Sequence, residues 1–185
     1  MSALETMSTA PAKSVIHAVR REDTAGGALD PAYVRRALGH YTTGVTVVTT
    51  LGAGGAPIGL TANSFTSVSM DPPLVLWCLA SKSPNLQAFR RAGAFAVNVL
   101  HTEQRELCRR FSDPRIPARF AGVAWRSGKL GVPVLDGCLA TFECRAWSEH
   151  EAGDHVVFIG RLTHIEHLEG EPLVFSQGRL GQFRH

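Results

Sequence analysis

Residues 57–84 read PIGLTANSFTSVSMDPPLVLWCLASKSP, and this run predicts both a β fold and a binding site. Two stretches of strand-type residues flank the break Asp71-Pro72-Pro73, and hydroxyl and amide side chains interrupt the first stretch. A buried strand does not need so many side-chain donors, because each one must find a partner or costs free energy. A strand that lines a pocket for a polar, phosphate-bearing ligand does need them. The alternative is an edge strand that carries Thr and Ser because they suit β geometry.

The sequence on either side of this run is also rich in strands. Strand patterns are predicted at residues 44–50, from 58 onward, and at 74–79, 94–100, 138–147, 156–167 and 173–176. Helix starts are predicted at Asp30-Pro31, Ser83-Pro84 and Thr102, because each offers an N-capping side chain. Many strands, few short helices and repeated turns predict a mainly β fold, namely a barrel with peripheral short helices.

Composition limits the classes of function. The chain has 185 residues with 44% hydrophobic content, which predicts one domain with a sizeable core. Charged residues make up 19%, below the usual ~25%, and this indicates extra buried surface such as a subunit interface. The net charge of +3, without a basic stripe interleaved with aromatics, argues against a nucleic-acid binder. No apolar stretch approaches the ~20 residues of a membrane helix, and no signal peptide is visible, so we expect a cytoplasmic protein that does not contact membranes.

The chain divides into a tail and a domain. Residues 1–28 are rich in Ala, Ser, Thr and Gly, lack apolar periodicity, and are predicted to form a mobile N-terminal extension. The predicted domain covers residues 29–185. Its first helix begins at Asp30-Pro31 and carries an apolar stripe up to Gly39.

Basic residues concentrate in one segment of the domain. They are Arg105, Arg109, Arg110, Arg115, Arg119, Arg126 and Lys129. Only Glu106 and Asp113 oppose them there. A small anionic ligand fits this pattern, and a solvated loop fits it as well.

No metal site is expected. The four cysteines form no CxxC pair, and we expect them to be apolar buried thiols. His164 and His167 lie in a β pattern, where residues three apart point to opposite faces. The glycines at 52–55 lack a phosphate-loop motif and precede a strand, so a hairpin turn is the better interpretation.

Gly153-Asp154-His155 precedes a strongly β-branched strand. The plain interpretation is a Gly-Asp turn with a histidine that merely begins the next strand. The functional interpretation places an imidazole at the mouth of a strand, where it could contact a ligand's amide or ring. The residues alone leave both open.

Several motifs together resemble a known family. In chain order they are Gly44-Val-Thr-Val-Val-Thr-Thr, Gly59-Leu-Thr-Ala-Asn-Ser-Phe-Thr-Ser-Val-Ser, Asp71-Pro-Pro-Leu-Val, Ser83-Pro-Asn, Phe95-Ala-Val-Asn-Val-Leu, Arg110-Phe111 and Gly153-Asp154-His155. This order closely resembles the flavin reductase family, the small reductase components of two-component flavin-dependent monooxygenases. Each motif is weak alone, but their shared order over about residues 30–178 is specific.

The resemblance implies a fold, a reaction and partners. The fold is a split β-barrel of the FMN-binding type, usually a homodimer with flavin sites near the subunit interface. The implied activity is that of an NAD(P)H:flavin oxidoreductase, in which NADH or NADPH reduces FMN or FAD. Reduced flavin then diffuses to a separate monooxygenase. The sequence leaves FAD against FMN, NADH against NADPH, and the identity of the oxygenase open.

The resemblance also implies site residues. The implied cofactor-binding set is Pro57, Ile58, Gly59, Leu60, Thr61, Asn63, Ser64, Cys78, Leu79, Ala80, Ser81, Ser83, Pro84, Asn85, Arg110, Phe111, His155, Phe175, Ser176 and Gly178. The first half of the 57–84 run would contact the flavin ring and ribityl chain, and the second half the phosphate. His155 would position the nicotinamide, and no residue is expected to act as an acid or base.

Two other functions are compatible with a split barrel. One is an oxidase with tightly bound FMN, like the pyridoxamine phosphate oxidases, although Gly153-Asp154-His155 argues against it. The other is a non-catalytic module that binds flavin or haem.

Overall fold

The computed structural model describes residues 28–183, and almost all of the predicted N-terminal extension lies outside them. The helices are α1 (Pro31–Leu38), α2 (Leu86–Ala92) and α3 (Arg105–Ser112), with a 3-10 turn, η1, at Ala53–Gly55. The strands are β1 (Thr43–Gly44), β2 (Thr46–Leu51), β3 (Pro57–Ala62), β4 (Thr66–Met70), β5 (Pro73–Ala80), β6 (Ala94–Val99), β7 (Trp125–Ser127), β8 (Pro133–Leu135), β9 (Ala140–Ala152), β10 (His155–His167), β11 (Leu173–Ser176) and β12 (Arg179–Gln182).

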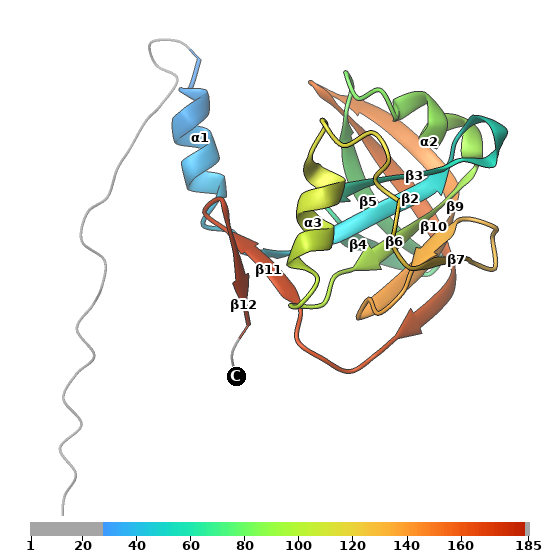
Figure 1. Cartoon of the computed structure of the whole chain (residues 1–185). Coiled ribbons are helices and arrows are strands. Elements are labelled where there is room, and N and C mark those ends of the chain that lie inside the picture. The colour runs from blue at the N-terminus through green and yellow to red at the C-terminus, as the bar shows by residue number, and fades with distance from the viewer. Residues whose placement is uncertain (1–27, 184–185) are drawn as a thin grey trace, which may run out of the picture.

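One antiparallel sheet dominates the fold. Its strand order is β3-β2-β6-β9-β10-β5-β4, and Figure 1 shows it curved into a barrel with α2 and α3 on the outside. β3 and β4 follow each other in the chain yet lie at opposite edges of this sheet, so the chain crosses between the edges at residues 63–65. The predicted mainly β barrel with peripheral short helices is confirmed.

Two hairpins organise the barrel, and the first of them was predicted. β2 pairs with β3 through the glycine turn at η1, where Gly54 has a φ of 69°. β9 pairs with β10 through Gly153-Asp154, and Gly153 has a φ of 63°, a conformation that favours glycine. The second hairpin places His155 at the first position of β10, opposite Ala80 at the end of β5.

An aromatic cluster fills the barrel. Trp77 on β5 is fully buried, stacks on Phe158 of β10 with ring centroids 5.1 Å apart, and contacts Phe89 and Phe95 edge-on. Offset and edge-on arrangements of this kind are favoured between aromatic rings. Phe89, together with Leu86, fixes α2 against the barrel, as their shared helical face predicts.

A second cluster lies under α3. Phe111 and Cys108 of α3 are buried against Val47, Leu100 and other apolar residues. This cluster fixes α3 beside β3, where the helix forms one side of the site described below.

α1, β1, β11 and β12 lie outside the main sheet, although Leu173 of β11 is fully buried in the cluster under α3 and joins them to the barrel. β1, β11 and β12 form a separate three-stranded sheet, and Figure 1 shows α1 and this sheet to one side of the barrel. No residue of α1 is buried, and the neighbouring Tyr41 is 79% exposed. We call α1, β1, β11 and β12 the arm. No helix within residues 28–183 is long and apolar enough to cross a membrane.

The structure corrects several local predictions. α2 begins at Leu86 rather than Pro84, because residues 81–85 form turns first. α3 begins at Arg105, and Thr102 does not cap it. Residues 112–135, which lack a strand or helix pattern and were expected to be a loop, contain the short β7–β8 hairpin, and β12 was not predicted. Short strands with few alternating residues carry little sequence signal.

Candidate functional site

A hollow of about 460 Å³ lies beside the outer side of β5. Its lining residues come from β3 and the crossing after it, from the end of β5 and the turns that follow, from α3 and from the start of β10. They are Leu60, Thr61, Ala62, Asn63, Ser64, Cys78, Leu79, Ala80, Ser83, Pro84, Asn85, Phe111, Ser112, Pro114, Arg119 and His155. We call this space the β5 hollow. Most of the residues that the resemblance implied for a flavin site meet here.

A serine ties the crossing segment, residues 63–65, to β5. The main-chain N–H of Cys78 donates to Ser64 Oγ at 2.9 Å, and Ser64 Oγ lies 3.4 Å from the Cys78 carbonyl oxygen. Residues 75, 77 and 79 of β5 are buried, so the alternation of a strand turns Cys78 and Ala80 outward. The hydroxyl of Ser64 therefore fixes the strand edge that the hollow opens onto.

The opposite wall is formed by β3 and α3. Thr61 Oγ1 donates to the carbonyl oxygen of Cys108 at 2.8 Å and ties the strand to the helix. A Cβ atom on Gly59 would lie 2.7 Å from Cε1 of Phe111, so only glycine lets the Phe111 ring lie this close to β3. This close approach places the edge of an aromatic ring at the hollow.

Side chains that could donate hydrogen bonds to a phosphate lie in the turns after β5. Ser83 Oγ accepts a hydrogen bond from the Asn85 N–H at 3.3 Å, and its hydroxyl proton remains available to a ligand. The Ser81 N–H donates to the carbonyl oxygen of Asp154 at 2.9 Å, which ties these turns to the β9–β10 turn. Small hydroxyl and amide groups therefore gather at one end of the hollow.

His155 stands at the mouth of the hollow. Its Nδ1 lies 2.7 Å from Oδ1 of Asp154, and its side chain is 47% exposed. The hydrogen bond from His155, followed by the charge of its ring, lowers the pKa of Asp154. With Nδ1 engaged by the carboxylate, Nε2 is the ring nitrogen left for a ligand.

A second hollow, of about 410 Å³, adjoins the first. Its lining residues come from the start of β3, from Pro84 and Asn85, and from the segment after α3. They are Pro57, Ile58, Gly59, Pro84, Asn85, Pro114, Ile116, Pro117, Ala118, Arg119, Phe120 and Ala121. We call it the loop hollow. The two hollows share Pro84, Asn85, Pro114 and Arg119.

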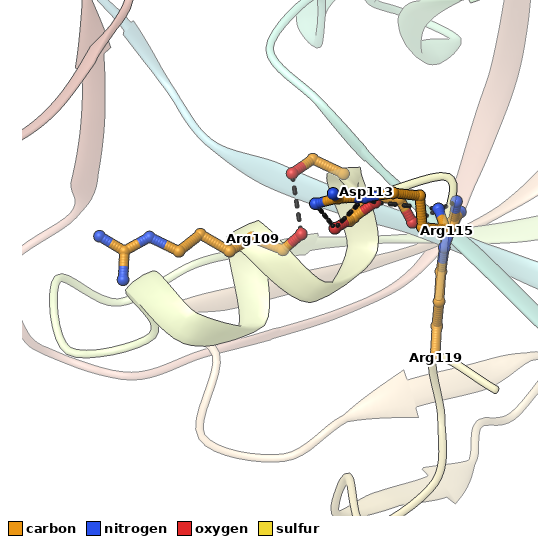
Figure 2. A network of polar contacts seen from close by, with 5 residues as sticks. Arg109, Asp113, Arg115 and Arg119 are labelled. Carbon is orange, nitrogen blue, oxygen red and sulfur yellow. Dashed lines mark hydrogen bonds and ion pairs between the residues drawn. The ribbon is translucent and has the colours of Figure 1, made fainter. Parts of the chain in front are cut away.

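Polar contacts after α3 hold the wall of both hollows (Figure 2). Arg119 donates through Nη1 to the carbonyl oxygen of Gly59 at 3.1 Å and through Nη2 to that of Asp113 at 3.0 Å. The Asp113 carboxylate accepts from the side chain and main-chain N–H of Arg115, which lowers its pKa to about 2. Arg119 therefore fixes residues 113–119 against β3.

Some of the implied residues lie elsewhere. Ser81 is in the turn described above and lines neither hollow. Arg110 also lines neither hollow, and it donates to the carbonyl oxygen of Ala121. Phe175, Ser176 and Gly178 belong to the arm, where the Gln177 N–H donates to the Gly39 carbonyl oxygen. The chain does not bring these three residues to its own β5 hollow.

Four residues that line the β5 hollow were not predicted from the sequence: Ala62, Ser112, Pro114 and Arg119. Arg119 was visible as a member of the basic segment 105–129, but spacing could not separate it from its neighbours. In the structure its guanidinium binds main-chain carbonyls, whereas Arg115 pairs with Asp113 and the Arg109 side chain points away from that pair (Figure 2).

The cysteines behave as structural thiols, with one exception. Burial raises the pKa of Cys138 to about 11 and that of Cys144 to about 12, so both stay protonated at neutral pH. Cys108 is also buried and its pKa is raised. Cys78 is half-buried and borders the β5 hollow, which corrects the expectation that all four are buried. Within residues 28–183, no group of three or more His, Cys, Asp or Glu side chains could hold a metal.

The lining of the β5 hollow suits a flavin mononucleotide unit. Leu60 and the edge of Phe111 supply apolar surface for a flat ring, and Asn63 supplies amide groups near it. Ser83 supplies a hydroxyl donor for the phosphate end. No acidic residue is among the lining residues that the structure describes, so nothing there repels an anionic ligand.

Comparison with known proteins identifies the family. The model of the "Flavin reductase like domain" matches residues 38–184. This chain belongs to that family. The NADH-dependent FMN reductase SmoA of Agrobacterium fabrum is 48% identical over 149 residues, which are 80% of this chain and 84% of the relative. HsaB of Rhodococcus jostii, the reductase subunit of a flavin-dependent monooxygenase, is 42% identical over 84% of this chain and 79% of its own length.

Other relatives differ in length. A probable flavin reductase of Rhizobium meliloti is 48% identical over 80% of this chain, but the chain spans only about half (48%) of that relative. Among solved structures, the NADH:FAD oxidoreductase SgcE6 of Streptomyces globisporus, in complex with NAD and FAD fragments, has a TM-score of 0.81 and 37% identity. That match covers 90% of this chain and 98% of the other. It supports the predicted split-barrel fold of the flavin reductases.

Proposed function

We propose that this protein is an NADH:flavin oxidoreductase that reduces FMN or FAD and releases reduced flavin to a separate monooxygenase. The observation that carries the proposal is the β5 hollow, where Asn63, Ser83 and His155 meet from three separate parts of the chain. Family membership and the names of SmoA and HsaB support the reaction and the partner.

The hollow's two ends suggest how a flavin would lie. The ring would rest between β3 and the end of β5, beside Leu60, Asn63 and the Phe111 edge. The ribityl chain and phosphate would extend toward Ser83 and Asn85, whose side chains supply a hydroxyl and an amide. Ser64 and Thr61 would act indirectly, because their hydroxyls already hold the walls.

The protein's part in the reaction is orientation. When bound, the nicotinamide and flavin supply the hydride chemistry, and near-contact stacking of their rings is what the protein must secure. The apolar walls exclude water from the ring face, and the fixed strands keep the two binding regions in register. No side chain is assigned the role of acid or base, because hydride passes directly between the two rings.

His155 is proposed to position the nicotinamide. It lies at the mouth of the hollow, on the first residue of β10, and Asp154 holds its Nδ1. The remaining ring nitrogen can then meet the carboxamide of the nicotinamide ring. Because this contact involves no proton transfer, its loss should act on KM for the nicotinamide substrate.

We also propose that the protein is a homodimer in which the arm contacts a second copy. α1 has an apolar stripe but no buried residue, and Leu38 and Tyr41 are 68% and 79% exposed. Phe175, Ser176 and Gly178 lie on this arm, away from the chain's own hollow, so a partner subunit's site is where they could contribute. Light scattering after size exclusion tests the dimer, and a mass near the 20.0 kDa of one chain contradicts it.

The function is tested by following NADH oxidation with purified protein, with and without added FMN or FAD. The proposal predicts turnover that rises with free flavin and saturates. A flavin that co-purifies, never exchanges and supports oxidation of another substrate would instead favour the tightly bound oxidase. NADH oxidation that does not depend on added flavin contradicts the proposal.

A further inference from the structure

The outer half of the β9–β10 hairpin, residues 148–159, has a neighbouring strand on only one side. Along this half β10 pairs with β5, from His155 inward. On the other side β6 pairs with β9 only as far as Arg145. Within residues 28–183, no strand pairs with residues 148–152 of β9 on that side. The strand that leads into the turn before His155 therefore lacks the support that a second ladder would give.

A β-bulge also turns this half of the hairpin. Ser148 of β9 lies opposite Ile159 and Ala146 lies opposite Gly160, so Trp147 is an extra residue in β9. A bulge bends its strand and increases the local twist. The bulge therefore changes the direction in which residues 148–152 leave the barrel, and a contact from outside the ladder is what would hold that direction.

Arg90 of α2 makes such a contact. Its Nη2 donates to Oε1 of Glu151 at 3.3 Å, and its Nε lies 3.0 Å from Oε1 of Glu149. The two glutamates are two residues apart in a strand, so their side chains share one face. Glu151 lies opposite Val156, the residue directly after His155. One guanidinium thus joins α2 to the unsupported strand at the level of the His155 turn.

The contact has a firm base in α2. Leu86 and Phe89 are buried and fix this helix against the barrel. The Arg90 side chain is only 26% exposed, and its Nε is buried without a hydrogen bond, so the nearby Glu149 carboxylate is the group that offsets its charge. A charge in this position depends on its partners more than a fully exposed one does. Arg91, by contrast, is exposed, and its guanidinium has no partner within residues 28–183.

We propose that Arg90 is a positioning residue for the nicotinamide substrate. By holding Glu149 and Glu151 it fixes the β9–β10 turn, and it thereby keeps His155 at the mouth of the β5 hollow. The inference rests on the proposed function, because it needs His155 to contact the nicotinamide. It goes further, because it assigns the placement of the imidazole to a helical side chain that lines neither hollow.

Arg90→Met tests the proposal by removing both contacts while keeping an unbranched side chain. KM for NADH should rise roughly threefold with KM for flavin and kcat unchanged, because a less fixed imidazole weakens one contact with the nicotinamide. The effect is modest because β5 still pairs with His155. Arg90→Lys keeps the charge and should restore part of the loss. Arg91→Met is the matched control, one residue further along α2, and should behave as the wild type.

A double-mutant cycle shows whether Arg90 acts through His155. In the His155→Ala protein, Arg90→Met should cause no further rise in KM for NADH, because the group that it positions is gone. The full rise in that background would mean that Arg90 acts by another route, and it overturns the proposal. An unchanged KM for NADH in Arg90→Met alone, or an equal rise in KM for flavin, also overturns it.

Hydrogen exchange followed by mass spectrometry tests the contact without turnover. In Arg90→Met, the amides of residues 148–155 should exchange faster than in the wild type, and those of β2 and β6 should not change. Unchanged exchange at 148–155, or equal acceleration throughout the barrel, contradicts a local positioning role. If the wild type shows no flavin-dependent NADH oxidation, the proposed function fails and the role toward NADH fails with it, even where exchange confirms that Arg90 holds the hairpin.

Discussion

One face of β5 packs in the core of the barrel, and the other borders the β5 hollow. Val75, Trp77 and Leu79 point into the barrel and are at most 5% exposed, whereas Cys78 and Ala80 border the β5 hollow. The inner face is closed by ring stacking, and the outer face is left open between hydrogen-bonded walls. The inner face of the strand therefore contributes to stability and the outer face to ligand binding. Substitutions on the inner face should change the free energy of unfolding, and substitutions around the hollow should change KM.

The largest expected effect is on the inner face. Trp77→Ala removes the ring at the centre of the aromatic cluster, and the free energy of unfolding should fall by about 3–5 kcal/mol. Urea denaturation followed by circular dichroism measures this. Trp77→Phe is the matched control, because it keeps a ring on Phe158 and removes an indole N–H that is buried without a partner. A loss below about 1 kcal/mol in Trp77→Ala would show that the cluster is not the core of the barrel.

The next effect is on the outer wall. Arg119→Met removes both hydrogen bonds to main-chain carbonyls, so the segment after α3 is no longer fixed to β3. KM for flavin should rise about tenfold, equivalent to about 1.4 kcal/mol, with a smaller change in kcat. Arg109→Met is the control, since that side chain is exposed and points away from the network (Figure 2). Equal flavin KM in the two variants would mean that Arg119 does not shape the site.

A smaller effect is expected at the mouth of the hollow. His155→Ala should raise KM for NADH roughly threefold to tenfold, the range for losing one hydrogen bond, and should change flavin affinity less. Steady-state kinetics and a separate FMN titration give the two values. His150→Ala, on an exposed histidine of β9 outside both hollows, should behave as the wild type. Unchanged constants in His155→Ala would remove this residue from the site.

The smallest effect concerns pH. The pKa of Asp113 falls from 3.8 to about 2 in the folded protein, mainly through its hydrogen bond with Arg115. A lowered pKa means that the pair stabilises the folded segment above pH 3.8 and that this contribution is lost as pH falls toward 2. Flavin affinity should therefore show no titration from this pair between pH 5 and 8. Asp113→Asn mimics the protonated form, so it should lose this small contribution at every pH and should lack the acid-side fall in unfolding free energy between pH 4 and 2 that the wild type shows. An acid-side fall of the same size in both proteins, measured by urea denaturation, would contradict this assignment.

Much of this comparison was predictable from sequence. The break at Asp71-Pro72-Pro73, the glycine turn at 52–55 and the strand character of residues 74–79 are local signals, and the structure confirms the elements they predicted. The alternation of buried and outward residues along β5 is visible only in the structure, because residues 74–79 form a continuous apolar run in the sequence. The order of motifs identified the family and, through it, most of the residues lining the β5 hollow.

The remainder depends on contacts that sequence does not encode locally. Arg119 became recognisable only when folding brought it to Gly59, sixty residues earlier in the chain. Thr102 has the character of a helix cap, yet Glu103 and Gln104 continue a turn and α3 begins only at Arg105. Phe175 and Ser176 matched the family's pattern, but they lie on β11 in the arm and do not line the β5 hollow. Their place depends on how the arm packs, which the local sequence does not show.

The most direct test of the central claim uses the outward cysteine of β5. Alkylation by iodoacetamide at pH 8, followed by peptide mass spectrometry, should modify half-buried Cys78 well before buried Cys138 and Cys144, whose pKa values are raised to about 11 and 12. The account predicts that saturating FMN slows modification of Cys78 strongly and leaves the slow rates of the other two unchanged. Modification of Cys78 at the same rate with and without FMN, in protein that oxidises NADH when FMN is added, would contradict a flavin site in the β5 hollow.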